Sequence, residues 1–247
     1  MVPGSWNEGR RPLQTDKRTN AEFDRYAASY DELLSDPLRS RFARDPLHFH
    51  RRKWLLIQRL LRDARVTPAS LRWLDVGSGR GELLELAGKS FLTATGCDPS
   101  AEMPASYASV KTHKQKSLVE LPFNGGSFDF VTGVCVLHHV SKEDRLLLTA
   151  EIRRVLSPRG LCCIIEHNPM NPVTRRIVKR SPLDVNAELL TAGETSRLLR
   201  ATGYEVIRRE YFLYLPEGLF QRFGAVERVL RKLPLGGQYA LLAQRSS

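Results

Sequence analysis

The chain opens with apolar residues at helical spacing. After Asn20, which suits a helix cap, one face carries Phe23, Tyr26, Ala27, Tyr30 and Leu34. A second apolar stripe precedes Ala64 and consists of Trp54, Leu55, Ile57, Leu60 and Leu61. These patterns predict a disordered polar lead-in over residues 1–19 and an N-terminal helical cap over residues 20–66.

From Leu71 onward, apolar runs of strand length alternate with helical patterns. Strands are predicted at residues 71–76, 91–100, 110–113, 128–140, 161–169, 204–215 and 236–245. Helices are predicted at residues 81–89, 101–109, 141–160, 191–203 and 217–233. Such alternation is typical of a doubly wound, mostly parallel sheet, so residues 67–247 are predicted to form one α/β domain. The last two strands leave room for an antiparallel hairpin at one edge.

Composition narrows the class of protein. A chain of 247 residues with 42% hydrophobic and 26% charged residues can form one large globular domain. It contains no apolar run long enough for a membrane span, and its N-terminus lacks the apolar segment of a signal peptide. The four cysteines lie in or beside predicted strands without CxxC spacing. Free thiols, a cytoplasmic location and no metal site are therefore predicted.

The charge balance leaves two interpretations open. Lys and Arg number 38 against 27 Asp and Glu, which gives a formal net charge of +11. This excess favours an anionic partner such as a phosphorylated metabolite, a nucleic acid or an acidic membrane surface. A basic, solvated face without any partner explains it equally well.

Three glycines follow the first predicted strand at alternate positions. In the stretch LRWLDVGSGRGELL, Gly77, Gly79 and Gly81 lack Cβ atoms and allow a tight turn that a ligand can approach closely. A dinucleotide fingerprint would need glycine at position 82, where Glu82 stands. Asp75 would repel a pyrophosphate, but it suits a ligand that carries an ammonium group.

The second predicted strand also ends in an acid. Asp98 follows Asp75 by 98 − 75 = 23 positions, close to the roughly 20-residue offset at which an acid binds ribose hydroxyls. S-adenosylmethionine, a nucleoside joined to an amino acid through a sulfonium, matches the glycine loop and both acids together. The sequence therefore predicts this cofactor.

These stretches resemble the class I S-adenosylmethionine-dependent methyltransferases, most closely the subgroup that acts on small molecules. The resemblance is carried by LDVGSGRGELL, GCDPS, LPFNGGSFDFV, VLHHV and LSPRGLCCIIEH, and it runs from about Tyr26 to the C-terminus. It implies a seven-stranded sheet whose last strand is antiparallel and inserted beside the fifth.

The resemblance also implies roles for individual residues. The methionine and ribose end of the cofactor would meet Asp75, Gly77, Ser78 and Gly79, and the ribose hydroxyls would meet Asp98 beside Pro99. Where the family commonly has an acid for the adenine amine, this chain has Ser117, and Leu118 would pack on the adenine ring. Cys135 would approach the methionine moiety, which Tyr26 or Tyr30 would cover.

The acceptor side is predicted at the ends of the fourth and fifth strands. A hydroxyl acceptor must lose a proton, which histidine can accept near neutral pH. His138 and His139 close the fourth predicted strand and, with period two, should face opposite sides; His139 is the candidate base. Glu166 and His167 end the fifth strand before a stiff Asn-Pro connection and are candidates for acceptor contact. A local basic patch follows at Arg175, Arg176, Lys179 and Arg180.

The predicted activity is methyl transfer to a small acidic, phosphorylated or glycosylated metabolite, with oxygen as the favoured acceptor atom. A nucleic-acid methyltransferase is the first alternative, disfavoured because the Asn-Pro-Pro and Pro-Cys motifs of base methylation and a separate RNA-binding module are absent. A protein that binds the cofactor without catalysis is the second. The predicted helix 217–233 should help to cover the site, and its apolar residues Phe220, Phe223, Val226 and Val229 could pack on the sheet edge or on a second subunit. The oligomeric state is not predicted.

Overall fold

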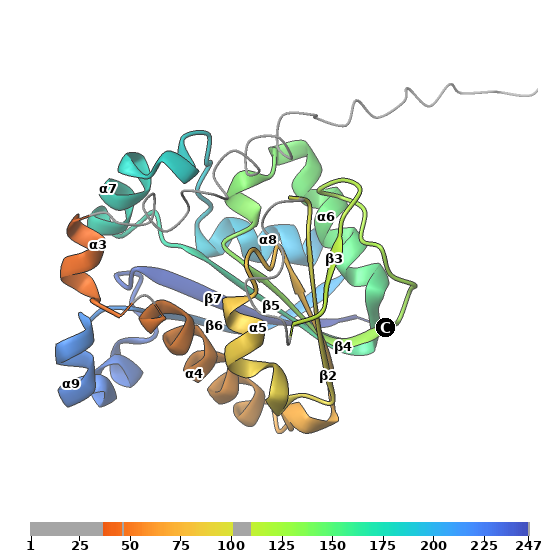
Figure 1. Ribbon diagram of the computed structural model, residues 1–247, viewed down its shortest axis with the longest axis horizontal. Coiled ribbons are helices and arrows are strands. Elements are labelled where there is room, and N and C mark those ends of the chain that lie inside the picture. The colour runs from red at the N-terminus through yellow and green to blue at the C-terminus, as the bar shows by residue number, and fades with distance from the viewer. Residues whose placement is uncertain (1–36, 46, 101–109, 247) are drawn as a thin grey trace, which may run out of the picture.

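The computed structural model describes residues 37–45, 47–100 and 110–246, which form a seven-stranded sheet between two layers of helices (Figure 1). The strand order is β3-β2-β1-β4-β5-β7-β6. The strands are β1 (Arg72–Val76), β2 (Thr93–Asp98), β3 (Thr112–Lys114), β4 (Phe128–Val134), β5 (Leu156–His167), β6 (Tyr204–Phe212) and β7 (Gln238–Arg245). Only β7 runs antiparallel to its neighbours β5 and β6. The predicted doubly wound sheet, with its last strand inserted beside the fifth, is therefore confirmed.

The described helices lie between or beside these strands. They are α3 (Pro37–Phe42), α4 (His48–Asp63), α5 (Glu82–Ala87), α6 (Lys142–Val155), α7 (Pro172–Arg180), α8 (Ala192–Ala201) and α9 (Glu217–Leu230). Short 3-10 turns include η4 (Leu137–His139) and η5 (Pro182–Asp184). No helix in this described part of the chain has the length and apolar character that a membrane crossing requires. The predicted helices at 20–36 and 101–109 fall outside the described residues.

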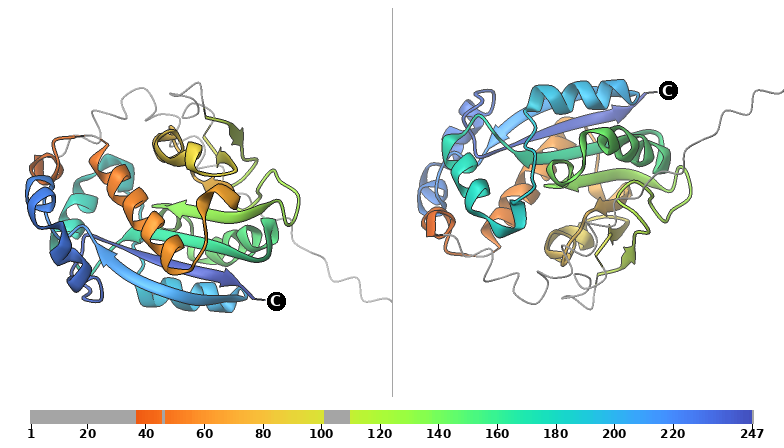
Figure 2. Two further views of the ribbon diagram at one scale, coloured as in Figure 1. Left: turned by 90° about the horizontal axis from the view of Figure 1, so that it is seen from below. Right: turned by 90° about the horizontal axis from the view of Figure 1, so that it is seen from above.

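Helices cover both faces of the sheet (Figure 2). Each face has its own apolar core. On one face Trp73 and Phe130 pack with Leu60 of α4 and Leu84 of α5. On the other, β-strand residues pack against α6 and α8 through Ile152 and similar side chains. Because the central strands are buried on both faces, they appear in the sequence as unbroken apolar runs.

Local signals explain several helix starts. Ser141 accepts a hydrogen bond from the Asp144 backbone N–H at the start of α6. Thr191 and Glu194 form a reciprocal capping box at the start of α8. Asn171 caps α7, whose first residue is proline, a residue that costs no hydrogen bond in the first turn.

The fourth strand is shorter than predicted, and the fifth is longer. β4 ends at Val134, because Cys135 adopts a left-handed conformation with φ 58° and turns the chain into η4. β5 begins at Leu156 rather than at Leu161. Its register against β4 jumps from Phe128↔Leu156 to Phe130↔Leu161, so the residues between loop out of the ladder. The predicted helix 141–160 therefore ends at Val155, and Pro158 and Gly160 lie in this loop.

Helix α9 directs most of its apolar stripe away from the protein, and only Phe220 of that stripe packs inward, against Arg52. Phe223 is 56% and Val229 82% exposed, whereas Glu227 is buried. The carboxylate of Glu227 pairs with Arg52 of α4 and accepts hydrogen bonds from the Tyr214 and Leu215 backbone N–H groups. The polar side of the helix is therefore its anchor, and Phe223 and Val229 do not pack on the sheet edge.

Candidate active site

A cavity of about 460 Å³ opens at the carboxyl ends of the parallel strands. The last residues of four strands line it: Val76 of β1, Asp98 of β2, Val134 of β4 and His167 of β5. The strand order reverses between β1 and β4, which is where ligands bind in doubly wound sheets. The volume lies within the range of small-molecule sites.

The glycine loop forms one wall of this cavity. Gly77 has φ +66°, and a Cβ there would lie 2.6 Å from Cγ2 of Val136. The Gly77 and Ser78 backbone N–H groups donate to the Cys97 carbonyl at 2.8 and 3.1 Å, which fixes the loop against the end of β2. Asp98 accepts from the Gly79 backbone N–H at 2.8 Å and holds the loop from the other side. Glycine is therefore required at position 77 both by backbone conformation and by space.

Asp75 lies buried at the end of β1 and lines the cavity. The Thr132 hydroxyl donates to its Oδ1 at 2.5 Å and accepts from the Trp73 indole N–H at 2.8 Å, so the direction of both bonds is set. Burial raises the pKa of Asp75 to about 7, against the opposing effects of the Thr132 hydrogen bond and of Lys53. A cationic group placed in the cavity would stabilise the ionised form.

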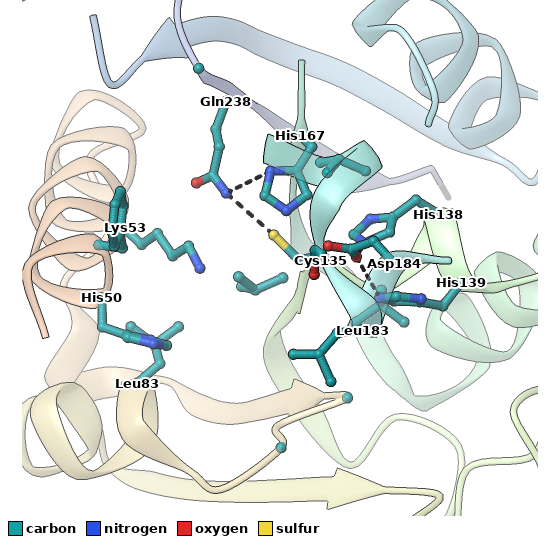
Figure 3. A pocket seen from close by; sticks show the side chains of 18 of the residues that line it. His50, Lys53, Leu83, Cys135, His138, His139, His167, Leu183, Asp184 and Gln238 are labelled. Atoms are coloured by element: carbon teal, nitrogen blue, oxygen red, sulfur yellow. Dashed lines mark hydrogen bonds and ion pairs between the residues drawn. The ribbon is translucent and has the colours of Figure 1, made fainter. Parts of the chain in front are cut away.

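Lys53 supplies the opposite charge from α4. Its side chain is buried, lines the cavity and extends its ammonium group into it (Figure 3). Among the described residues no ion pair or hydrogen bond engages it. The sequence analysis missed this residue, although one signal was present: Lys53 precedes Ile57 and Leu60 at i+4 and i+7, so it lies on the buried stripe of the helix. Leu55, which was assigned to that stripe, is 52% exposed.

The predicted cofactor residues are largely brought together, with one departure. The cavity is lined by Asp75, Gly77, Ser78, Gly79, Asp98, Pro99, Leu118 and Cys135. Ser117 is not among the described lining residues; its neighbour Gln115 is, buried and two positions earlier. Tyr26 and Tyr30 lie outside the described residues.

His138 and His139 do not face opposite sides as predicted. Because β4 ends before them, they lie in the 3-10 turn η4, where their ring centroids are 4.1 Å apart and both line the cavity. The period of two that separates neighbouring side chains in a strand does not apply there. No glycine or proline marks the turn at Cys135, so the apolar run gave no sign of it.

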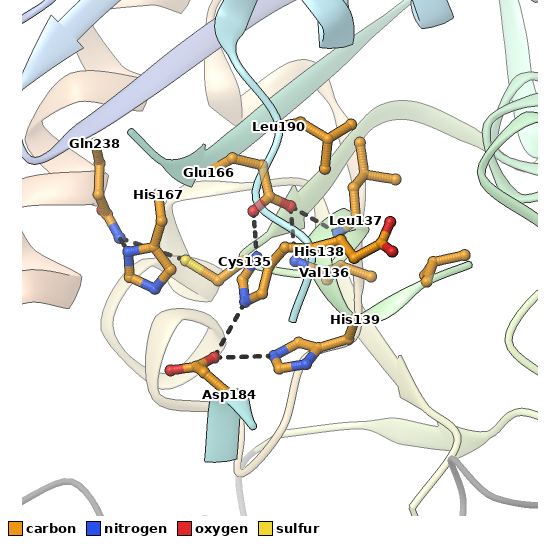
Figure 4. Close-up of polar contacts among 12 residues, drawn as sticks. Cys135, Val136, Leu137, His138, His139, Glu166, His167, Asp184, Leu190 and Gln238 are labelled. Carbon is orange, nitrogen blue, oxygen red and sulfur yellow. Dashed lines mark hydrogen bonds and ion pairs between the residues drawn. The ribbon is translucent and has the colours of Figure 1, made fainter. Parts of the chain in front are cut away.

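His138 lies between two carboxylates (Figure 4). Its Nδ1 is 2.5 Å from Oε2 of Glu166, and its Nε2 is 3.4 Å from Oδ1 of Asp184. Burial alone would lower the pKa of His138, but the two carboxylates outweigh it and raise the pKa to about 10. Asp184 comes from η5 and was not singled out in the sequence, since only the folded chain brings that loop to η4.

Glu166 is a supporting residue rather than a lining residue. It is buried behind His138, and its Oε1 accepts from the Val136 and Leu137 backbone N–H groups at 2.9 and 2.6 Å. Of the two residues predicted for acceptor contact, Glu166 therefore does not line the cavity, whereas His167 does. Both oxygens of the Glu166 carboxylate are engaged, Oε1 by the backbone of η4 and Oε2 by the His138 ring.

The other two histidines of the site are poor bases in this environment. Burial, together with the charge on His138, lowers the pKa of His139 to about 3 and that of His167 to about 4. Gln238 of β7 approaches His167 Nδ1 at 3.5 Å and Cys135 Sγ at 3.4 Å through its amide nitrogen, while its buried Oε1 has no hydrogen-bond partner among the described residues. An acceptor hydroxyl that enters this region meets Gln238 Oε1 as an available acceptor.

The basic residues of α7 face away from this cavity. Arg175, Arg176, Lys179 and Arg180 line a separate shallow depression on the outer side of the helix. The inner side of α7 contributes Val173, Thr174 and Ile177 to the cavity wall instead. These cations therefore lie near the acceptor region without reaching into it.

A family model and a known relative both connect the chain to methyltransferases. A family model described as a methyltransferase domain matches residues 74–164. A ubiquinone biosynthesis O-methyltransferase of Agrobacterium fabrum is 26% identical over 167 residues, which cover 58% of this chain. They cover 63% of the relative, so the chain spans less than two thirds of that protein's length.

Two solved structures share the fold. An S-adenosylmethionine-dependent methyltransferase of Thermotoga maritima, described as a possible histamine N-methyltransferase, superposes with a TM-score of 0.64 at 18% identity, covering 92% of this chain and 99% of that one. Magnesium protoporphyrin IX methyltransferase of Synechocystis, solved with bound SAH, gives 0.61 at 16% identity, covering 92% and 98%. At these identities the likeness establishes the architecture.

Proposed function

We propose that the chain is a class I S-adenosylmethionine-dependent methyltransferase that transfers the methyl group of this cofactor to a hydroxyl oxygen of a small molecule. One observation carries the proposal. A single cavity joins the glycine loop, with Asp75 and Asp98, to the histidines at the ends of β4 and β5. Donor and acceptor can therefore meet in one enclosed space.

The residues present fit the cofactor. Its amino acid part is a zwitterion, and the cavity offers Asp75 for the ammonium and Lys53 for the carboxylate. Asp98 would meet the ribose hydroxyls, and Gln115 and Leu118 would meet the adenine, since all three line the cavity. The buried hydroxyl of Ser78 has no partner in the described part of the chain and lines the same cavity, so a ligand there would satisfy it. The bound cofactor supplies a methyl group on a positively charged sulfur, and the protein's task is to align the reactants and exclude water.

The lining of the remaining space supports a small, mainly apolar acceptor. Phe42, Val173, Ile177, Leu213 and Tyr214 contribute apolar surface, while His139, His167 and Gln238 provide polar groups. Such a lining suits an aromatic or aliphatic body that presents one hydroxyl. The cations on the outside of α7 would draw an acidic acceptor toward the cavity without binding its body. The matched relative from Agrobacterium is named an O-methyltransferase, which also favours oxygen.

The four cysteines are all free, and three are fully buried. Unpaired thiols fit a protein of a reducing compartment, so we place the reaction in the cytoplasm.

The experiment is a labelled methyl transfer. The purified chain is incubated with S-adenosylmethionine carrying a deuterated methyl group and with a small-molecule extract, and mass spectrometry identifies metabolites that gain the label. Fragmentation of the product then locates the label on oxygen, nitrogen or carbon. Asp98→Ala, which should fail to hold the cofactor, is the control. A parallel incubation uses the macromolecular fraction of the same cells, and label found only in its RNA or protein, or in neither fraction, would contradict the proposal.

A further inference from the structure

We propose that His138, His139 and Asp184 bind a divalent transition-metal ion, with zinc as the simplest occupant, and that this ion receives the acceptor's hydroxyl oxygen. Each residue offers one ligand atom, and the three atoms lie within 4.8 Å of one another. All three residues line the cavity, so the open side of the group faces the space for the acceptor. This departs from the expectation of no metal site, which considered only the cysteines.

The spacing of the ligand atoms suits a shared cation better than direct hydrogen bonds. Asp184 Oδ1 lies 3.4 Å from His138 Nε2 and 3.5 Å from His139 Nε2. Both separations exceed the roughly 2.7–3.2 Å of a good N–H···O bond. Ligand atoms about 2.1 Å from a tetrahedral ion are about 3.4 Å apart. Two imidazoles and a carboxylate also form a ligand set that zinc and similar ions accept, and the fourth position remains open.

A second carboxylate supports the first ligand from behind. Glu166 engages Nδ1 of His138, which leaves Nε2 of that ring directed at Asp184 (Figure 4). A carboxylate on the far nitrogen of a ligating histidine fixes its orientation and strengthens it as a ligand. Glu166 is itself held by the backbone N–H groups of Val136 and Leu137. The arrangement is therefore a built carboxylate–histidine pair and not a chance surface cluster.

The segments that carry the ligands are tied together. The Glu188 backbone N–H donates to the His138 carbonyl at 2.8 Å, joining the end of the η5 loop to η4. The guanidinium of Arg145 donates to the Leu137 and Glu188 carbonyls and spans the same two segments. Among the described residues, neither Glu166 nor Asp184 forms an ion pair with lysine or arginine. A divalent cation would replace the proton held on His138 and would balance both buried carboxylates.

The ion would supply the deprotonation that the reaction needs. A hydroxide on the ion takes the acceptor's hydroxyl proton and leaves as water, and the acceptor oxygen takes its position. A lone pair of that oxygen then forms the new O–CH3 bond while the S–CH3 bond breaks. The electron pair of the broken bond stays on sulfur, which becomes a neutral thioether. This step rests on the proposed hydroxyl methylation, whereas metal binding does not.

The test measures metal binding directly, on the full chain without a histidine tag and after chelator treatment. Calorimetric titration with Zn²⁺ should give one site per chain, and Co²⁺ should produce the visible absorption bands of a low-coordinate site. His139→Ala and Asp184→Ala should lose this site. Glu166→Gln should weaken Zn²⁺ binding about 10–100-fold. His113→Ala removes an exposed histidine of β3 and should change nothing.

Binding of S-adenosylhomocysteine to every variant reports whether the variant is folded. If Zn²⁺ and Co²⁺ do not bind, or bind equally to the wild type and to Asp184→Ala, the metal site is wrong. If methyl transfer proceeds undiminished in chelator, the proposed role of the ion in the reaction is wrong while the proposed function stands. If Zn²⁺ binds but no hydroxyl compound gains a methyl group, the proposed function fails and the metal site stands.

Discussion

Thr132 of β4 donates its hydroxyl proton to Asp75 of β1 at 2.5 Å, across two adjacent parallel strands. The same oxygen accepts the Trp73 indole N–H, and the Leu74 carbonyl, the other acceptor near this hydroxyl, is farther away at 3.5 Å. Asp75 is thus a buried acid with one fixed donor, with its remaining capacity open to the cavity. Its charge state controls what can bind there.

Cofactor affinity should depend on pH through Asp75. Burial raises the pKa of this acid to about 7, while Lys53 opposes the shift and Asp98 and Glu82 add to it. Only the ionised carboxylate attracts an ammonium group, so affinity for S-adenosylhomocysteine should rise as the pH increases from about 6 to 8. Below the pKa, the affinity should fall by at most about tenfold per pH unit. Calorimetry across this range provides the measurement.

Asp75→Asn is the control for this titration, since it keeps the shape and cannot ionise. Its affinity should be low and flat with pH. A wild-type profile that is equally flat would show that Asp75 does not carry the effect. The stability of the fold should change with pH in the opposite direction, because the Asp75 carboxyl binds its proton more tightly in the folded chain than in the unfolded chain. The contribution of Asp75 to stability should therefore fall as the pH rises from about 4 to 7.

Lys53→Met should weaken cofactor binding without weakening the fold. Lys53 has no described partner to lose, and methionine fills the same buried stem of α4. A charged hydrogen bond contributes about 1.5–3 kcal/mol, so affinity for S-adenosylhomocysteine should drop roughly 10–150-fold. Affinity for 5′-methylthioadenosine, which lacks the amino acid part, should not change. Lys89→Met, at an exposed position, is the matched control.

Gly77→Ala should abolish cofactor binding. The added Cβ would lie 2.6 Å from Cγ2 of Val136, and the backbone would have to keep φ near +66°. Val136→Ala in the same chain removes the close contact but not the backbone strain. Urea unfolding should therefore show a lower free energy of unfolding for Gly77→Ala. The double variant should recover only part of that loss. Full recovery would mean that space alone requires glycine at this position.

The glycine-loop side of the cavity could be predicted because its signals are local. An apolar run, alternate glycines and an acid at each strand end lie within the stretch from Leu71 to Asp98, and the fold keeps them in that order around the cavity. Each residue needed only its own strand or turn to be recognised.

The acceptor side could not be predicted in the same way. Cys135 turns the chain with φ 58° although it is not a glycine. The apolar run up to Val140 therefore looked like one continuous strand, and the strand period of two was wrongly applied to His138 and His139. Asp184 and Gln238 reach the site from a loop and a strand that only tertiary packing places there. The exposed stripe of α9 has a similar cause, because one buried ion pair outweighs the apolar pattern of the whole helix.

The buried ion pair between Arg52 and Glu227 should stabilise the folded chain. Their side chains are 5% and 6% exposed, and the guanidinium also stacks over Phe220. Arg52→Met would leave a buried carboxylate without its cation, so the free energy of unfolding should fall by about 3–5 kcal/mol. Glu227→Gln should restore part of that loss when added to Arg52→Met. The amide retains an acceptor for the Tyr214 and Leu215 N–H groups and no longer places a charge in the interior. Urea unfolding of the two single variants and the double variant tests this order. A double variant less stable than Arg52→Met alone would mean that hydrogen bonding, and not charge pairing, anchors α9.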